Sequence, residues 1–254
     1  MIDLSNQTVL LIGGVNDLMT GVAAAMHQAG AGLVVAYQPP LDDPALLDAL
    51  PMADIREVTL RDPAVLAEEI AGLTFQTALI SPGWFAHLPF MEATPEDIDA
   101  ALQGNFEYAT YAAQAVAKRL IAQGSGGTIL FLTSVVSLTP WVHTNLAGSS
   151  LAALEVVAKM AAVDLAAYGI RVNLVAAGWV EGAWARPLLT EDGKMHIESD
   201  IPLGPVGAPR SVGEACCFLA SPFAAYITGA ILSVDGGFLL TKSAGTTPYP
   251  PRTG

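Results

Sequence analysis

The segment Thr8-Val-Leu-Leu-Ile-Gly-Gly14 is a continuous apolar run that ends in two glycines. A short run without polar alternation is typical of a strand buried on both faces, as strands are in parallel sheets. Similar runs recur along the chain, and longer helical patterns separate them. They lie at residues 33–36, 77–80, 128–132, 170–176 and 230–234. This alternation predicts a parallel sheet covered by helices on both faces.

Helix start signals stand between these runs. Asp62-Pro63 and Thr94-Pro95 each place a capping side chain before a proline at the first helical position. The second of these predicts a long helix reaching about Ala122, another helix is expected from Leu146 to Tyr168, and Ser211 is expected to cap a later one. We therefore expect an α/β fold: a single-domain, Rossmann-like, doubly wound parallel sheet in three layers. It should span residues 1–240, followed by an irregular tail at residues 241–254.

The charge balance excludes several classes of partner. The chain of 254 residues carries 11 Lys and Arg against 24 Asp and Glu, a formal net charge of −13. Nucleic acids and anionic membrane surfaces bind proteins through clustered positive charge, so neither is an expected partner. Only 14% of the residues are charged and 52% are hydrophobic. Such low charge favours an oligomer, which buries apolar surface between subunits.

The apolar content does not come from a membrane span. The longest uncharged stretches, Val135 to Leu154 and Ala215 to Val234, both contain proline and several polar residues. The first residues lack the basic region of a signal peptide. The only cysteines, Cys216 and Cys217, are adjacent and are not expected to form a disulfide. A reduced, cytoplasmic protein is the expectation.

Two further stretches carry a family resemblance. They are Asp164-Leu-Ala-Ala-Tyr-Gly-Ile-Arg-Val-Asn173 and Tyr226-Ile-Thr-Gly229, which continues into Val234-Asp-Gly-Gly237. Together with the element order they resemble the short-chain dehydrogenase/reductase family, over nearly the whole chain to about Phe238. The resemblance implies a Rossmann-like fold. It also implies a nicotinamide dinucleotide site and an Asn-Ser-Tyr-Lys catalytic tetrad, which we compare position by position.

The positions that hold the cofactor in this family are altered here. The family's nucleotide turn has three glycines, which fall on Gly13, Asp17 and Met19. Asp17 would place a carboxylate where the pyrophosphate should bind and would instead cap the helix, and Met19 would add bulk there. Tyr37 follows the second strand, where the family offers an acid or a base to the ribose. Thr59 replaces the adenine-contacting Asp.

The charge of this region points the same way. Residues 1–55 contain no Lys or Arg, but they contain six aspartates: Asp3, Asp17, Asp42, Asp43, Asp48 and Asp54. Uniform negative charge repels a dinucleotide's phosphates. We therefore expect no cofactor.

Half of the catalytic tetrad is missing. The family's Asn and Ser match Asn105 and Ser134. Its Tyr, thirteen residues after the Ser, falls on Ala147, and its Lys, four residues later, falls on Leu151. Neither alanine nor leucine can transfer a proton. The resemblance therefore implies that Asn105 and Ser134 are vestigial, with structural hydrogen bonds in place of catalytic roles.

A few other residues could carry function. Ser134 and His143 could form a nucleophile and base, although no third group is evident. Tyr108 and Tyr111 lie three residues apart on one helix face and are interpreted as subunit-interface residues. Histidines and cysteines show no metal-ligand spacing, so no metal site is expected.

These observations leave more than one hypothesis open. The first is a non-catalytic pseudoenzyme that supports an active homologous subunit in a hetero-oligomer, such as a heterotetramer. The resemblance is to heteromeric dehydrogenases of this family, and it implies acyl-CoA-type hydroxyacyl dehydrogenation in anaerobic aromatic degradation. The alternatives are a non-redox isomerase, lyase or cyclase that uses Ser134, His143 and Asn105, and a ligand-binding protein that reuses the old pocket.

Overall fold

The computed structural model describes residues 2–39, 45–50, 53–182 and 197–244. Within them, seven parallel strands form one sheet in the order β3-β2-β1-β4-β5-β6-β7. The strands are β1 (Thr8–Gly13), β2 (Gly32–Tyr37), β3 (Ala53–Glu57), β4 (Thr77–Ser81), β5 (Gly127–Ser134), β6 (Ile170–Ala177) and β7 (Ile231–Val234). The predicted doubly wound parallel sheet is confirmed.

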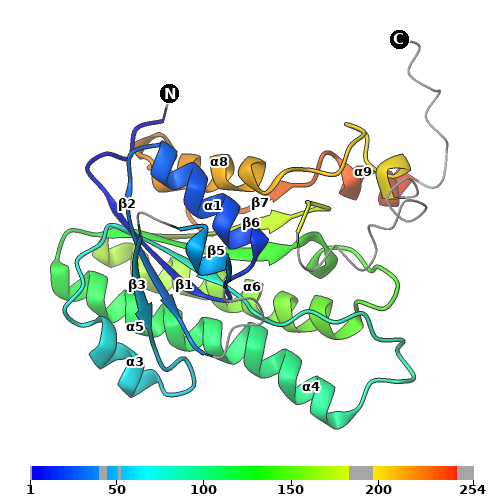
Figure 1. Cartoon of the computed structure of the whole chain (residues 1–254), viewed down its shortest axis with the longest axis horizontal. Helices are drawn as coiled ribbons and strands as arrows, with labels where there is room; N and C mark the ends of the chain where they lie inside the picture. Colours follow the sequence, from blue (N-terminus) through cyan, green and yellow to red (C-terminus); the bar gives the residue numbers. More distant parts are fainter. Residues whose placement is uncertain (1, 40–44, 51–52, 183–196, 245–254) are drawn as a thin grey trace.

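Helices cover both faces of this sheet (Figure 1). One face carries α1 (Asp17–Gln28) and α8 (Pro209–Ala220), and the other carries α3 (Pro63–Ile70), α5 (Tyr108–Gln123) and α6 (Asn145–Leu165). Alternate residues of β1 serve the two layers: Val9 and Leu11 pack under α1, and Leu10 and Ile12 pack on the opposite side. This explains why β1 is apolar at every position from Val9 to Ile12.

Short elements complete the described part of the chain. They are α2 (Ala45–Asp48), α4 (Pro95–Ala101), the π-helical η1 (Leu102–Glu107), the 3-10 turns η2 (Val135–Ser137), η3 (Ala166–Tyr168) and η5 (Pro222–Ala224), and α9 (Phe238–Ala244). Thr94 starts α4 with a capping box, in which its hydroxyl accepts the N–H of Asp97 and its own N–H is bound by the Asp97 carboxylate. The predicted long helix is therefore present, as α4, η1 and α5 in succession, with a π segment that the pattern did not indicate.

The two stretches that carry the family resemblance bind each other. Asn173 in β6 donates from Nδ2 to the carbonyl of Ile227 at 2.9 Å and accepts the N–H of Ala230 at 3.0 Å. The hydroxyl of Thr228 accepts the N–H of Val172. The guanidinium of Arg171 reaches the carbonyl of Leu219 at 2.8 Å, and its partial burial lowers its pKa. These side chains hold the segment that leads into β7 against β6.

One strand and the ends of two helices differ from the sequence predictions. The strand β3 was not predicted because it lies at the sheet edge with four exposed residues and the sequence Ala53-Asp-Ile-Arg-Glu57, which lacks an apolar run. The helix α8 begins at Pro209 after Ala208, so Ser211 lies inside its first turn and does not cap it. The helix α9 continues to Ala244, four residues beyond the expected end of the domain.

One helical segment, Asn145–Tyr168, is long and apolar enough to satisfy a composition test for a membrane span. Its inner face packs on the sheet through residues such as Leu151, Leu154 and Ala158, which are almost fully buried. Core helices of α/β proteins pass the same test, so this segment is weak evidence for a membrane.

Glycines bring α1 and α8 close together. A Cβ atom on Gly21 would lie 2.3 Å from the Cβ of Pro209, and one on Gly213 would lie 2.6 Å from the Cβ of Ala25. Carbon atoms do not approach this closely, so any larger residue would push the helices apart. Gly21 and Gly213 therefore set the close approach of α1 and α8.

Substituting Gly21→Ala tests this contact. We expect the free energy of unfolding to fall by about 1–3 kcal/mol because the added methyl group overpacks the interface. The matched control is Gly72→Ala, since a Cβ atom on Gly72 meets nothing within 4 Å. Urea unfolding followed by circular dichroism gives both values, and equal stability of the two variants would show that the helices have room to spare.

Candidate functional site

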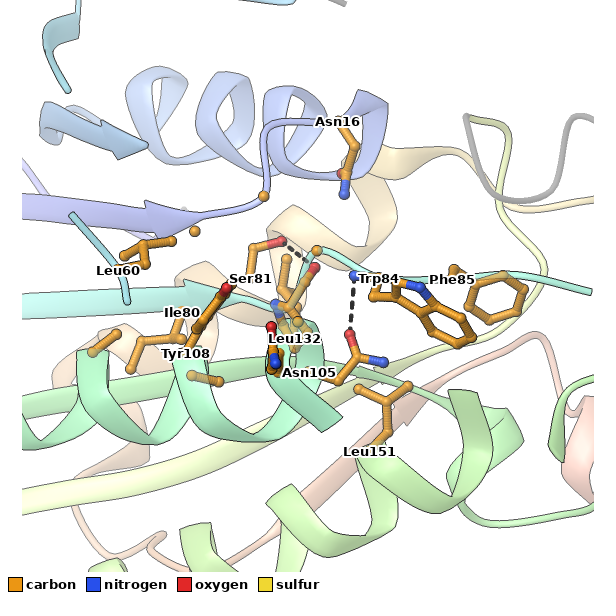
Figure 2. A pocket seen from close by; sticks show the side chains of 18 of the residues that line it. Asn16, Leu60, Ile80, Ser81, Trp84, Phe85, Asn105, Tyr108, Leu132 and Leu151 are labelled. Atoms are coloured by element: carbon orange, nitrogen blue, oxygen red, sulfur yellow. Dashed lines mark hydrogen bonds between the residues drawn. The ribbon is translucent and has the colours of Figure 1, made fainter. Parts of the chain in front are cut away.

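A cleft of about 530 Å³ opens at the carboxyl ends of β1, β4 and β5. The strand order reverses between β1 and β4, and open α/β sheets bind ligands at such a reversal. Figure 2 shows the cleft with Asn105 and Tyr108 on one wall, and Trp84 and Phe85 toward one end. The cleft occupies the place where the family resemblance implies a dinucleotide.

Two glycines shape the turn after β1. Gly13 has a φ of +119°, and a Cβ atom on it would lie 2.1 Å from the carbonyl oxygen of Ser81. A Cβ atom on Gly14 would lie 2.8 Å from the Cα of Gly83. The N–H of Gly14 donates to Ser81 at 2.9 Å. The turn thus depends on close approach of two backbones, which only glycine permits.

The start of α1 differs from the expectation for Asp17. Asn16 is the capping residue: its backbone is extended, and its side-chain oxygen accepts the N–H of Met19 at 2.9 Å. Asp17 is the first helical residue, so the prediction that it caps the helix is wrong. Its side chain lies beside Gly182 in the segment after β6, where a Cβ atom on Gly182 would come within 2.9 Å of the Asp17 Cβ. The N-terminus of α1 is therefore capped by the side chain of Asn16 and already has a negative charge next to it, the carboxylate of Asp17.

Met19 lies in the core. It is fully buried in the cluster between the sheet, α1 and α8, with Val22 and Val212 among its members. The prediction that its bulk fills the phosphate position is wrong, because a residue at this place on α1 faces the sheet layer. What the substitution changes is the core packing under the helix.

Tyr37 and Thr59 are both engaged elsewhere. The hydroxyl of Tyr37 donates to Glu57 Oε1 at 2.9 Å, and this hydrogen bond raises the pKa of Tyr37. The N–H of Thr59 donates to Glu69 Oε2 at 2.8 Å. Neither residue lines the cleft, where Gln38 and Leu60 stand instead. No carboxylate among the described lining residues is available for a ribose hydroxyl.

The charge of the cleft wall differs from that of the surrounding sequence. None of the described lining residues is Asp or Glu, and one of them, Arg61, is basic. Of the six aspartates in residues 1–55, Asp42 and Asp43 lie outside the described residues and the other four do not line the cleft. The expected repulsive charge is thus absent from the described wall itself.

Arg61 and Tyr108 line the cleft, although the sequence pattern did not indicate this position for either residue. The guanidinium carbon of Arg61 lies 5.9 Å from the centre of the Tyr108 ring, within the range of a cation–π contact. Arg61 directly precedes the Asp62-Pro63 helix start. Its place in the loop before a helix could have indicated a residue at the edge of the sheet. Tyr108 lines the cleft, and its predicted place at a subunit interface, like that of Tyr111, stays a prediction.

Asn105 lies in the π-helical segment and is almost fully buried. Its side-chain oxygen accepts the N–H of Trp84 at 3.0 Å, and its side-chain nitrogen donates to the hydroxyl of Ser150 at 3.0 Å (Figure 2). These bonds connect the segment after β4 to α6 across one wall of the cleft. Asn105 therefore has a structural task in this chain.

The remaining tetrad positions offer one hydroxyl and two apolar groups. Ser134 is buried at the end of β5, where its oxygen accepts the N–H of Val136 at 3.4 Å. Leu151 lines the cleft and points from α6 toward Asn105 (Figure 2). Ala147 is fully buried and is not a lining residue. The tetrad positions therefore do not fit the contacts that the family resemblance implies for a nicotinamide dinucleotide, because the phenol and ammonium groups are missing at Ala147 and Leu151.

The structure does not bring Ser134 and His143 together. His143 lines a second cavity of about 450 Å³ with Phe90, Trp141 and other residues, whereas Ser134 lines the first cleft. His143 has a φ of 61°, and its carbonyl accepts the N–H of Leu88. Ser134 and His143 are therefore not arranged as a nucleophile and its base.

The aromatic residues near this region form a core cluster. The rings of Trp141 and Trp179 are 5.4 Å apart, edge to face, and both pack on Phe238. Trp184 and His196 lie outside the described residues.

No group of three or more His, Cys, Asp or Glu side chains in the described ranges could hold a metal ion. Cys216 and Cys217 are both free and buried. Burial raises the pKa of both thiols, that of Cys217 to about 11, so neither is a nucleophile at neutral pH.

Comparison with known proteins gives consistent matches. Residues 18–239 match the family described as enoyl-(acyl carrier protein) reductase. L-rhamnose-1-dehydrogenase of Scheffersomyces stipitis is 28% identical over 93% of this chain and 97% of its own length. 3beta-hydroxysteroid dehydrogenase 1 of Eggerthella lenta is 30% identical over 94% of this chain and 95% of its own length.

Among solved structures, an oxidoreductase of the short-chain dehydrogenase/reductase family from Burkholderia thailandensis superposes with a TM-score of 0.83 at 26% identity. The superposition covers 96% of this chain and 99% of that one.

Substituting Asn105→Ala should destabilise the folded protein by about 1–3 kcal/mol, because the buried N–H of Trp84 loses its acceptor. The control is Gln114→Ala, since Gln114 is exposed on α5. Urea unfolding monitored by tryptophan fluorescence measures both variants. A change no larger than that of the control would contradict the structural task assigned to Asn105.

Proposed function

The chain belongs to the short-chain dehydrogenase/reductase family, and we propose that it is a non-catalytic member that supports an active homologous subunit in a hetero-oligomer. The observation that carries this proposal is the apolar inner part of the cleft. Ala147 and Leu151 stand at the positions of the family's proton donor and its lysine. Among the described lining residues only Arg61 and Tyr108 are titratable, and these contact each other. The position of the family's proton donor therefore lacks a general acid for hydride transfer.

The cofactor positions support the same proposal. The side chain of Asn16 already accepts the N–H of Met19 at the start of α1, where a phosphate would otherwise bind. The next residue, Asp17, adds a carboxylate there. Leu151 removes the cation that the family resemblance places beside the nicotinamide ribose. A chain with these residues is expected to bind no dinucleotide. Its relatives carry the names of oxidoreductases, and this chain would differ from them in chemistry while sharing their fold.

Two exposed apolar surfaces support an oligomer. The α6 stripe consists of Val156, Met160 and Val163, which are 58–70% exposed and lie on one helix face. The β7 surface consists of Phe223 and Tyr226, which are at least 76% exposed in the segment before the edge strand β7. Exposed apolar surface of this kind marks protein contacts. Two separate surfaces are what a tetramer of this chain and its partner requires.

The reaction of the complex is proposed from the resemblance. Among heteromeric dehydrogenases of this family, the chain resembles in character the non-catalytic subunit of hydroxybenzylsuccinyl-CoA dehydrogenase. We therefore propose a cytoplasmic complex that oxidises a hydroxyacyl-CoA in anaerobic aromatic degradation. Stabilising the active subunit by mass action is sufficient reason for a cell to keep such a chain.

Co-expression with an intact family member encoded nearby tests this proposal. We expect a stable complex whose dehydrogenase activity resides in the partner, and lower thermal stability for each chain expressed alone. Substituting Val163→Asp should weaken assembly by about tenfold or more, since it places a charge in an apolar interface. Analytical ultracentrifugation measures the assembly.

The matched control is Val65→Asp, because Val65 is an exposed valine on α3, outside both surfaces. It should leave assembly unchanged. The proposal is wrong if the chain alone forms a stable homo-oligomer that oxidises a substrate with NAD or NADP.

A further inference from the structure

We propose that the cleft binds a small amphipathic monoanion, an aryl or alkyl group bearing one carboxylate. This inference rests on the proposed function, since a cleft held by a dinucleotide would have no room for another ligand. The cavity of about 530 Å³ lies within the usual range for small-molecule sites, roughly 300–1,000 Å³. The cleft is therefore large enough to admit a small ligand.

The charge of the cleft wall favours a ligand with a negative charge. The chain has 24 acidic residues and 11 Lys and Arg, yet none of the described lining residues is acidic and one is an arginine. A cation would find no counter-charge on this wall. An anion with a single charge would find a counter-charge in Arg61. The net negative charge of the rest of the protein disfavours ligands with several negative charges.

Arg61 has the capacity to hold that anion. In the described part of the chain its guanidinium contacts the Tyr108 ring and makes no hydrogen bond or ion pair. The flat guanidinium presents several donors that match the two oxygens of a carboxylate. The contact with the Tyr108 ring keeps the guanidinium beside the cleft, which both residues line. Arg61 is exposed, so it lies where a charged group can keep part of its water.

The rest of the wall suits an apolar body. Ile80, Leu132 and Leu151 line the cleft, and the aromatic rings of Trp84 and Phe85 join them (Figure 2). Leu151 makes this part of the wall apolar. A lysine at this position would instead add a second positive charge, beside the apolar part of the ligand. The apolar part of the ligand therefore lies over β4, β5 and α6, away from Arg61.

Ser134 supplies one further contact. It is 2% exposed and lines the cleft, and its oxygen accepts one long hydrogen bond from Val136. In the described residues its hydroxyl proton has no acceptor. A buried donor without an acceptor is costly, so a ligand oxygen placed there would be favoured. The site thus combines an anion-binding mouth, an apolar body and a buried donor.

Titration of the purified full chain with 1-anilinonaphthalene-8-sulfonate, an aromatic monoanion that fluoresces in apolar sites, tests this site. We expect saturable binding that Arg61→Gln weakens by about fivefold or more, through loss of the charge-assisted contact. The matched control is Arg56→Gln on β3, which removes the same charge beside Asp54 and outside the cleft. The control should leave the dissociation constant unchanged.

Competition identifies the ligand class. Octanoate should displace the probe, whereas octylamine should not. Shortening the carboxylate from octanoate to butanoate should weaken displacement by about threefold or more for each methylene group removed. Equal effects of Arg61→Gln and Arg56→Gln, or equal displacement by octanoate and octylamine, would overturn the monoanion site and leave the proposed function intact. Displacement of the probe by micromolar NADH would overturn both.

Discussion

The backbone of Gly13 lies directly against that of Ser81, so closely that a Cβ atom would come within 2.1 Å of the Ser81 carbonyl oxygen. This approach joins β1 to β4 where the strand order reverses, and it opens the cleft at that point. Because the contact is made by backbone atoms and a glycine, it does not depend on any catalytic side chain. The cleft can therefore persist in a chain whose tyrosine and lysine have been replaced.

The residues kept from the family tetrad have tasks within the fold. Asn105 binds the segment after β4 to α6 through Trp84 and Ser150. Ser134 ends β5 and starts the η2 turn. Leu151 is buried against the cleft wall, where an ammonium group would need a counter-charge. Selection for stability alone would preserve the first two residues and tolerate the third.

The sequence predicted the sheet because β1, β4, β5 and β6 each contain three or four consecutive apolar residues between turn and helix signals. It failed at β3, whose exposed edge position allows Asp54 and Arg56. Spacing located Asn105, Ser134, Ala147 and Leu151, but it could not show the direction of a side chain. Met19 was therefore placed in the phosphate site although it lies in the core, and Tyr108 was not recognised as a cleft residue.

The central claim is that this member of the family has lost its nicotinamide dinucleotide. The most direct measurement is a titration of the purified chain with NADH and with NADPH, followed by energy transfer from tryptophan, since Trp84 lines the cleft. The account predicts no saturable signal for either cofactor up to about 1 mM, an affinity weaker than about −4 kcal/mol. Saturable binding of either one at micromolar concentration would contradict it.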